Sequence, residues 1–492
     1  MFIHEPAVWL FMSSSYVTKI GRKQSLLLPE MIDDYVDEDN PTRLFDSFVD
    51  SLDLKEMNFR YAALEQGPGR PSYDPSDMLK LYLWGYYNGI RSSRKLENEC
   101  HRNMEVMWLI HKLTPDFKTI SDFRKDNVDT VKSLFRKFNL FLKEQGLFKS
   151  HDIAVDGTKM KAVNSMDRSY SKEKLKKTMD DIDRKIDKYL HDMDENDEIE
   201  EDIDKEKIRK AIEKLREKKK ELKEAELKMD SSGTNEISLT DPDARQMKTR
   251  QGVDVCYNGH IAVESENHLI TDYTLDNDTN DYASVIPLAE GTRESMDSFD
   301  LSADKGHFSL PNLEDLSEAH IPAYIPRAEH GNPYRKTGLP KPEYHRSKFL
   351  YDKEKDVYVC PQGNEMHYNF VREVSSQHRV RYRVYTTDAC KLCPVRDKCT
   401  HSPRWRIMER WEHGDIEDEH WKRMKEKGVQ KMILRKRTME HPFGTIKRAM
   451  NQGYLLLRGL KKVRGEFGFS VIAYNMKRAI RIKGVRVLIQ AI

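Results

Sequence analysis

The sequence has no long apolar run. None of its 492 residues lies in a stretch that approaches the roughly 18 consecutive apolar residues of a membrane-spanning helix. The apolar start, FIHEPAVWLFM, is broken by His4, Glu5 and Pro6 and has no basic segment before it, unlike a secretion signal. We therefore expect a cytoplasmic protein with no membrane contact.

Cysteine is scarce as well. The chain has six, and four of them fall between Cys360 and Cys399. A chain this long does not need disulfides to build a core, and such crowding is more typical of a metal site in a reducing compartment than of a disulfide framework.

The net charge is close to zero, at +2, but positive and negative residues are distributed unevenly along the chain. Between positions 422 and 486 there are 19 Lys or Arg against three acidic residues, Glu426, Glu440 and Glu466. Local charge steers a binding partner, so this segment predicts a polyanion-binding surface, and nucleic acid is the natural candidate. The length predicts at least two domains.

Residues 30–150, which follow an N-terminal extension at 1–29, predict several short helices. In PSYDPSDMLKLYLWGYYNG, Asp74 can cap a helix that Asn88 and the next glycine end. A second helix, SSRKLENECHR, starts at a serine. The capping-box spacing from Thr119 predicts the start of a third.

Basic side chains accompany these helices. They are Arg91, Arg94, Lys95, Arg124 and Lys125. Two interpretations stay open: a helix-turn-helix that enters a DNA groove, or a helical packing domain with a solvated basic face.

The rest of the chain predicts an α/β domain that is interrupted by insertions. HDIAVDGTKM predicts a buried strand that carries Asp156 at its tip, and FDLSADKGHF predicts another that ends in Asp304. VDVCYNGHIAVES and HLITDYTL predict two more strands joined by a polar turn. The parts of this domain would be 151–170, 231–345 and 403–492.

Residues 171–230 predict an inserted antiparallel helical hairpin. Apolar residues recur there at steps of three, four and seven between dense charges, and the acidic stretch DENDEIEED marks the turn. Its charges are most simply a solvated face, and contact with a second subunit or with DNA is left open.

A second insertion, 346–402, combines short β-rich stretches with four cysteines. Cys360, Cys390, Cys393 and Cys399 have the spacing C-x29-C-x2-C-x5-C. Thiolates at such spacings can complete a tetrahedral Zn²⁺ site like that of a zinc ribbon, although CPQG supplies one cysteine where a ribbon usually has a pair. Free thiols and redox use of the C-x2-C pair are the alternatives.

Three acids stand out at the ends of predicted elements: Asp156, Asp304 and Glu440. Converging carboxylates repel one another unless cations lie between them, so such a cluster would bind two Mg²⁺ or Mn²⁺ ions, as phosphodiester chemistry requires. Each acid alone is more simply a helix cap or a surface charge. Nearby competitors are Asp152, Asp278, Asp281, Asp300 and Glu466.

Glu440 lies inside the basic stretch LRKRTMEHPFGTIKR. Lys447 follows it by seven residues, which is two helical turns, so both face one way if the helix continues past Pro442. We expect the basic residues of this segment to hold the phosphate backbone. They are Arg435, Lys436, Arg437, Lys447, Arg448, Arg458, Lys461 and Lys462.

Several motifs together resemble a known family. DGTKMKA, SLTDPDARQMKTRQGVDVCYNGHIAVES with DNDTND, SADKGHF, KRTMEHPFGTIKR and GYLLLRGLKKVRGEFGFSVIAYNMKR are similar to segments of the transposases of bacterial insertion sequences, the DDE group with an RNase H-like catalytic fold. The resemblance extends from about Leu26 to Lys483.

The resemblance implies a fold and an activity. The fold would be α/β, an RNase H-like mixed sheet flanked by helices, with an N-terminal all-α domain, the hairpin and the Cys-rich β insertion. The activity would be cleavage and joining of DNA at terminal inverted repeats and a target, by a homodimer that uses Asp156, Asp304 and Glu440. Relatives often have Tyr and Arg where this chain has Ile433 and Lys436. A non-cutting regulator and a nuclease without strand transfer are the alternatives.

Overall fold

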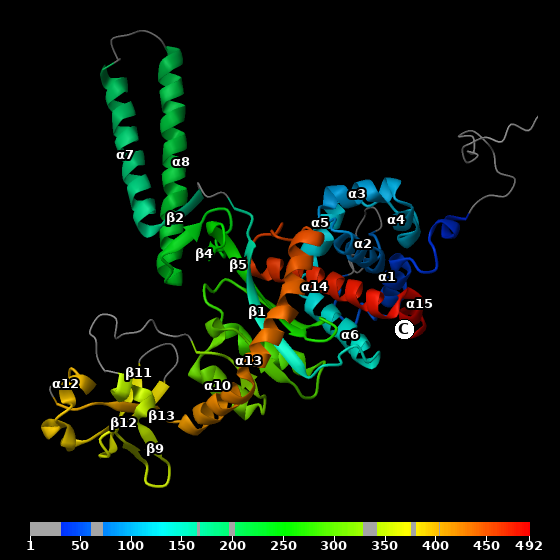
Figure 1. Cartoon of the computed structure of the whole chain (residues 1–492). Helices are drawn as coiled ribbons and strands as arrows, with labels where there is room; N and C mark the ends of the chain where they lie inside the picture. Colours follow the sequence, from blue (N-terminus) through cyan, green and yellow to red (C-terminus); the bar gives the residue numbers. More distant parts are fainter. Residues whose placement is uncertain are drawn as a thin grey trace, which may run out of the picture.

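The computed structural model describes residues 31–60, 72–164, 168–195, 202–327, 342–374, 380–402 and 404–492. The N-terminal extension predicted at 1–29 and most of the predicted hairpin turn lie outside these ranges. Figure 1 shows a helical part and a sheet joined in one body, a long hairpin that projects from it, and a small β unit at one end. The prediction of a mixed α/β protein with an N-terminal helical part is confirmed at this level.

The N-terminal part consists of short helices, as predicted. Asp74 caps the helix that begins at Pro75, where its Oδ1 accepts from the Ser76 amide at 2.8 Å. The elements are η1 (Ile32–Tyr35), α1 (Pro41–Asp50), α2 (Pro75–Tyr87), α3 (Ser93–Arg102), α4 (Met104–Leu109), α5 (Phe117–Asp126) and α6 (Val131–Glu144).

The predicted capping box at Thr119 is wrong. Helix α5 already begins at Phe117, and Asp116 caps it by accepting from the Lys118 and Thr119 amides at 2.9 and 3.0 Å. Thr119 instead donates its hydroxyl to Asp116 at 2.8 Å. An acidic side chain three residues earlier was the better acceptor, because an ionised carboxylate forms stronger hydrogen bonds with amides than a hydroxyl does.

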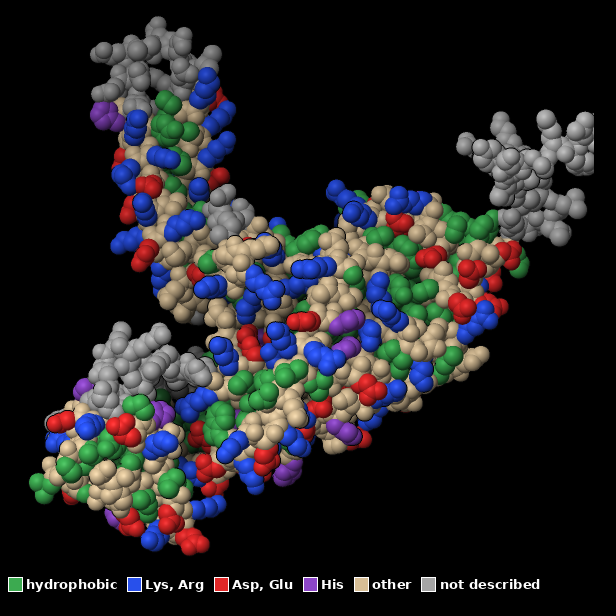
Figure 2. Space-filling view, viewed as in Figure 1, with side chains coloured by type: hydrophobic (Ala, Val, Ile, Leu, Met, Phe, Trp, Pro, Cys, Tyr) green, Lys and Arg blue, Asp and Glu red, His purple; other side chains and the backbone are tan. Residues whose placement is uncertain are grey.

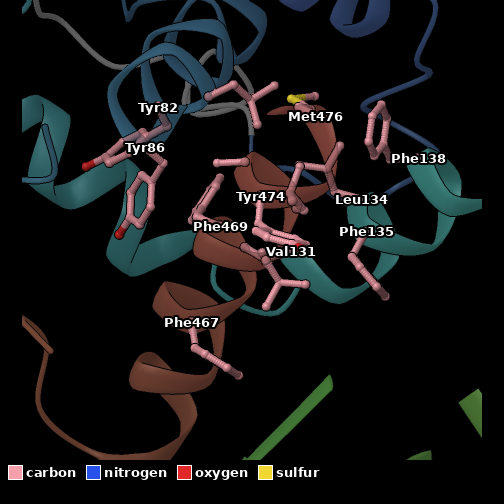
Figure 3. Close-up of a cluster of buried hydrophobic side chains, with 14 of the residues drawn as sticks. Tyr82, Tyr86, Val131, Leu134, Phe135, Phe138, Phe467, Phe469, Tyr474 and Met476 are labelled. Atoms are coloured by element: carbon pink, nitrogen blue, oxygen red, sulfur yellow. The ribbon is translucent and has the colours of Figure 1, made fainter. Parts of the chain in front are cut away.

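A helix from the far end of the chain completes the core of this helical part. Helix α14 (Leu460–Lys483) packs between α2 and α6 (Figure 3). The rings of Tyr82 and Tyr86 lie against Phe469, with centroids 5.5 and 5.2 Å apart. The first helices and the last long helix therefore share one hydrophobic core.

The larger sheet has the strand order β4-β5-β1-β7-β8, and β6 also pairs with β5. Strand β1 is antiparallel to β5 and parallel to β7, and β7 is parallel to β8. Their bounds are β1 (Asp152–Lys161), β4 (Arg245–Thr249), β5 (Gly252–Glu264), β6 (Ile270–Asp276), β7 (Asp300–Ser302) and β8 (Ala323–Tyr324). Helices α9 (Val285–Arg293) and α10 (Leu310–Glu318) lie between the later strands in the chain.

Strand β1 is longer than predicted. It continues to Lys161, so Asp156 lies in its middle and not at its tip. The apolar run ends at Val155, but pairing with the long strand β5 keeps the following polar residues extended. The partner strand β7 is short, as predicted, but it spans Asp300–Ser302 and ends before Asp304.

The hairpin forms from α7 (Lys172–Glu195) and α8 (Asp202–Ser232). At its base β2 (Ser169–Ser171) pairs with β3 (Glu236–Ser238). The helices bury a narrow apolar seam of their own, which includes Leu175, Ile182 and Leu222. The hairpin is thus a separate packing unit that projects from the body (Figure 1).

The Cys-rich insertion is a five-stranded antiparallel sheet. Its order is β13-β12-β11-β10-β9, and its buried core is small: Phe349, Tyr358, Met366, Tyr385 and Met408. The strands are β9 (Leu350–Asp352), β10 (Val357–Val359), β11 (Glu365–Val374), β12 (Val380–Thr386) and β13 (Met408–Trp411).

Helix α13 (Gly414–Gly444) follows this sheet and lies along β1, β7 and β8. It runs through Pro442 and continues as a π-helical turn, Thr445–Ala449, so the backbone stays helical from Glu440 to Lys447. A short loop then leads to α14 and α15 (Val485–Gln490).

Candidate active site

Two of the three predicted acids are brought close together by neighbouring strands: Asp156 lies on β1, and Asp304 lies just after the end of β7. In the parallel pair of β1 and β7, Asp152 is opposite Asp300 and Ala154 is opposite Ser302. Asp156 follows two residues after Ala154 on β1, and Asp304 follows two residues after the end of β7, where each carboxylate lies within range of the Arg435 charge. Sheet pairing thus brings together acids that are 148 positions apart.

Helix α13 supplies one cation to each level of this face. Lys431 forms ion pairs with both Asp152 and Asp300, the latter at 2.6 Å. One helical turn later, the Arg435 Nη1 lies 3.2 Å from Asp156 Oδ2. Two cations one turn apart on α13 therefore pair with acids four residues apart on β1.

Asp156 is held by two donors. Its Oδ1 accepts from the Gly157 amide at 2.8 Å, and its Oδ2 pairs with Arg435. Burial raises the pKa of Asp156, the guanidinium of Arg435 opposes the rise, and the charge of Asp304 adds to it. Such a carboxylate gains from an additional positive charge.

Asp304 caps the short helix η6 (Lys305–His307) and binds its own loop. Its Oδ1 accepts from the Gly306 amide at 2.9 Å and lies 2.6 Å from His307 Nδ1. Burial acts to raise the pKa of Asp304, but the hydrogen bond and charge of His307, with Arg435, hold it below its usual value. Sequence reasoning missed His307, although it stands in the motif SADKGHF.

A fourth carboxylate, Asp281, lies beside Gly157, which follows Asp156 on β1, and beside Gly306, in the turn that Asp304 caps. A Cβ on Gly157 would be 3.3 Å from Asp281 Oδ1, and a Cβ on Gly306 would be 3.3 Å from its Oδ2. Asp281 accepts from Asn258 Nδ2 at 2.7 Å and from Lys159 Nζ at 3.1 Å. The sequence marked Asp281 only as a competitor, but it is part of this neighbourhood.

Gly157 is required by the close packing behind Asp156. A Cβ at this position would lie 2.7 Å from His260 Nδ1, nearer than real side chains approach. His260 is fully buried and its ring lies 6.0 Å from that of His307. Any larger residue at Gly157 would have to displace the buried imidazole of His260.

The third predicted acid, Glu440, is placed differently. It is exposed on α13, five residues after Arg435 and so about 140° around the helix from it. Within the described ranges, no group of three or more His, Cys, Asp or Glu is arranged to hold a metal ion. Asp156 and Asp304 are brought together, and a metal site that includes Glu440 stays a prediction.

Most of the predicted phosphate contacts are exposed. Figure 2 shows Lys and Arg side chains gathering over the C-terminal half of α13. Arg435 is paired with Asp156, and Lys461 forms an ion pair with Asp129 at 2.7 Å. The exposed members are Lys436, Arg437, Arg448, Arg458, Lys461 and Lys462.

Lys447 faces inward, towards β1. Its Nζ donates to the carbonyl of Lys159 at 2.8 Å, and burial lowers its pKa. The side chain of Lys159 in turn reaches Asp281. Lys447 therefore anchors the end of α13 close to the aspartate neighbourhood.

Two of the N-terminal basic residues are not available to DNA. Arg91 and Arg124 are each 4% exposed. Arg91 pairs with the buried Glu466 at 3.2 Å and donates to the Tyr454 and Asn451 carbonyls, and Arg124 donates to the Arg91 carbonyl. The sequence could not reveal this, because Glu466 is 375 positions from Arg91.

Comparison with protein families identifies the chain. A family described as Transposase domain (DUF772) matches residues 30–126, and one described as Transposase DDE domain matches residues 359–480. The chain is a DDE transposase of the insertion-sequence type. A search of curated proteins found no match.

The DDE domain makes this DNA transposase an enzyme of the polynucleotidyl transferase and nuclease type. The matched DDE segment contains Glu440, Lys447 and the four clustered cysteines. None of the described helices combines the length and apolar character that crossing a bilayer requires.

Proposed function

We propose that this transposase binds the terminal inverted repeats of its own element, cuts the DNA there and joins the freed ends to target DNA. Asp156, Asp304 and Glu440 would hold the divalent ions, Mg²⁺ or Mn²⁺, on an RNase H-like sheet. The observation that carries the proposal is the proximity of Asp156, on β1, and Asp304, just after the parallel neighbour β7, with Arg435 of α13 close to both.

The strand order supports the fold part of the proposal. Three antiparallel neighbours, β6, β5 and β1, are followed by two strands parallel to β1, and this is the arrangement expected of an RNase H-like sheet. A long helix, α13, lies along β1 and carries Glu440. The cysteine-bearing sheet enters between β8 and α13 and leaves this order intact.

The residues present fit divalent ions. Asp156 and Asp304 present carboxylate oxygens, the ligands that Mg²⁺ and Mn²⁺ prefer, and their side chains are 30% and 37% exposed. The guanidinium of Arg435 already balances the negative charge of Asp156. Ions bound here would favour an attacking oxygen and neutralise charge on the leaving oxygen.

The chain's own residues would position the DNA for two successive displacements. In the first, water attacks the phosphorus and the bond to the 3′ oxygen breaks, which leaves a 3′-hydroxyl and a 5′-phosphate. In the second, that hydroxyl attacks a target phosphodiester and displaces a 3′ oxygen. Arg435 is placed to transfer its guanidinium from Asp156 to a phosphate oxygen, a partner it can bind through two nitrogens.

Glu440 would join the aspartates when DNA and ions bind. Its exposed side chain is not fixed in a core, and it stands between Arg435 and Lys447, which both contact β1. A carboxylate that completes a cage only in the bound state would keep three acids from repelling one another beforehand.

The basic segment after Arg435 would hold the phosphate backbone, which adds affinity that depends on salt and is blind to sequence. Base reading needs an element that enters a groove, and the N-terminal helices are the candidate. Arg94, Lys95 and Lys125 are exposed there. Two ends must be cut together, so we expect a homodimer.

Glu440→Gln tests the proposal. The variant should bind labelled inverted-repeat DNA as the wild type does but lose cleavage in Mg²⁺ by about a hundredfold or more, because the ions would lack a ligand. Gel shift measures binding, and a cleavage assay on the same DNA measures the chemistry.

Glu426→Gln, on an exposed turn of the same helix, is the matched control and should retain cleavage. Normal cleavage by Glu440→Gln would remove Glu440 from the site. Wild-type protein that cuts but never joins the ends to a target would favour the nuclease alternative.

A further inference from the structure

We propose that the small β unit is a structural zinc site, in which Cys360, Cys390, Cys393 and Cys399 together bind one Zn²⁺ ion. The site would be separate from the aspartates of the catalytic sheet. It would hold the loops of the unit against a sheet whose own core is too small to do so.

The four cysteines come from three segments and line a single cavity of about 30 Å³. That volume exceeds the roughly 10–15 Å³ needed for one water-sized occupant. All four thiols are free and partly buried. Among the described residues that line the cavity there is no His, Asp or Glu, so the four thiols are the side chains there that can bind a metal as anions, and thiolates are ligands of structural zinc.

The local backbone around Cys360 suits a metal ligand. The Gly363 amide donates to the Cys360 carbonyl at 2.8 Å, and Gly363 has a φ of +78°, which a side chain would strain. This tight turn in CPQG projects the thiol into the cavity. Cys393 and Cys390 are joined in a second turn, in which the Cys393 amide donates to the Cys390 carbonyl at 3.5 Å.

The electrostatics also favour a bound cation. Cys399 lies close enough to the other three cysteines and to Arg406 for their charges to act on it. Arg406 lines the same cavity, and its Nε is buried without a hydrogen-bond partner. Clustered thiolates would repel one another, and a dication removes that cost.

The small core of the β unit explains why a bound metal would stabilise it. One cluster of five buried side chains forms the core against which Cys360 and Cys399 pack, and Val357, Val384 and Trp411 are the other buried apolar residues of the described strands. A β unit with so little buried apolar surface usually needs a metal or disulfides for stability. The thiols now line the cavity without forming a closed group, so binding would draw them together by small movements of the two turns.

Elemental analysis of the full-length protein, purified without added metal or chelator, tests the proposal. We expect about one zinc per chain, and a mercurial thiol reagent with a zinc-sensitive dye should release that zinc as four thiols react. Cys399→Ser and Cys390→Ser should each lose most of the zinc. Cys100→Ser, which changes a buried thiol of α3 in the N-terminal core, should retain it.

The wild-type measurement does not depend on whether the variants fold. Protein with no zinc and four freely reactive thiols would overturn the proposal, and so would iron with visible absorbance or a Cys390–Cys393 disulfide. Zinc content is read without any DNA substrate. A zinc-bound protein that failed to cut DNA would contradict the proposed function and leave this site standing.

Discussion

Individual side chains around Asp156 and Asp304 are held by partners that the neighbouring sequence does not predict. His307 reaches Asp304 within one short helix, but Asp281 approaches both loops from a different segment. Asp281 accepts from Asn258 and Lys159 and touches the backbone at Gly157. It acts as a positioning residue, because it sets the geometry of groups that would bind the ions.

Asp281→Asn should therefore impair cleavage without abolishing folding. Loss of the Lys159 ion pair would loosen the packing of residue 281 beside Asp156 and Asp304. We therefore expect the cleavage rate to fall by about 10–100-fold, as for other groups that orient metal ligands. The Mg²⁺ concentration needed for half-maximal cleavage should rise as well.

Asp278→Asn is the matched control, because Asp278 is exposed in the same DNDTND segment. Equal cleavage by the two variants and the wild type would show that Asp281 is only a surface charge of this loop.

His420 gives a pH-dependent contribution to stability. It is fully buried on α13, with Nε2 3.0 Å from the Ile325 carbonyl. Burial lowers its pKa from 6.5, the Ile325 contact opposes this, and the nearby charges are Arg423 and Glu417. Because the unfolded chain takes up the proton more readily, stability falls as the pH drops below about 6.5.

His420→Gln should flatten that dependence. Between pH 7.5 and 5.5 the wild type should lose more free energy of unfolding than the variant, by up to about 1.4 kcal/mol per pH unit below 6.5. Urea unfolding at the two pH values measures the difference. Parallel losses in both proteins would mean that His420 protonates freely in the folded state.

At the scale of elements, ion pairs hold α13 on the strands beneath it. Lys431 bridges Asp152 and Asp300, its side chain is 14% exposed, and it lies over the Tyr324 ring at 4.9 Å. The pairs of Asp and cation recur four residues later with Asp156 and Arg435. The ion pairs of Lys431 with Asp152 and Asp300 thus hold α13 in the position from which Arg435 reaches Asp156.

Lys431→Met should destabilise the fold by about 1–3 kcal/mol, because it leaves two partly buried carboxylates side by side without a cation. Chemical denaturation measures this. Lys427→Met, an exposed change one turn earlier on α13, should stay within about 0.5 kcal/mol of the wild type. A variant as stable as that control would show that Lys431 does not seat the helix.

The elements themselves were largely predictable, because their signals are local. The cap at Asp74, the seam of the hairpin and the alternation in β5 and β6 each depend on residues within one segment. The alignment of β1 with β7 was not predictable from pattern, because it depends on pairing between segments 148 positions apart. The extension of β1 beyond Asp156 likewise depends on its partner β5.

At the scale of the whole molecule, a buried ion pair joins the two ends of the chain. Glu466 is fully buried and accepts hydrogen bonds from Arg91, at 3.2 Å, and from the Leu456 and Leu457 amides, each at 2.9 Å. The loop held in this way carries Arg458 and links α13 to α14. The N-terminal helices therefore fix a loop of the basic segment.

Glu466→Gln should cost about 3–5 kcal/mol, because Arg91 would stay buried without an opposite charge. Thermal or urea unfolding of the full chain measures the loss. Glu419→Gln, an exposed change on α13, should be nearly neutral. If Glu466→Gln were equally neutral, water would have to reach Arg91, and the ends of the chain would be joined less tightly than the contacts indicate.

The position of α14 inside the N-terminal helices limits how such proteins can be recombined. Phe469 from the last long helix fills the space beside Tyr82 and Tyr86 (Figure 3), so neither end of the chain forms a finished surface alone. A chimera that took its N-terminal helices from a relative would expose mismatched aromatic faces unless α14 came with them. The smallest exchangeable module is therefore discontinuous, and redesign of specificity must edit both ends of the gene together.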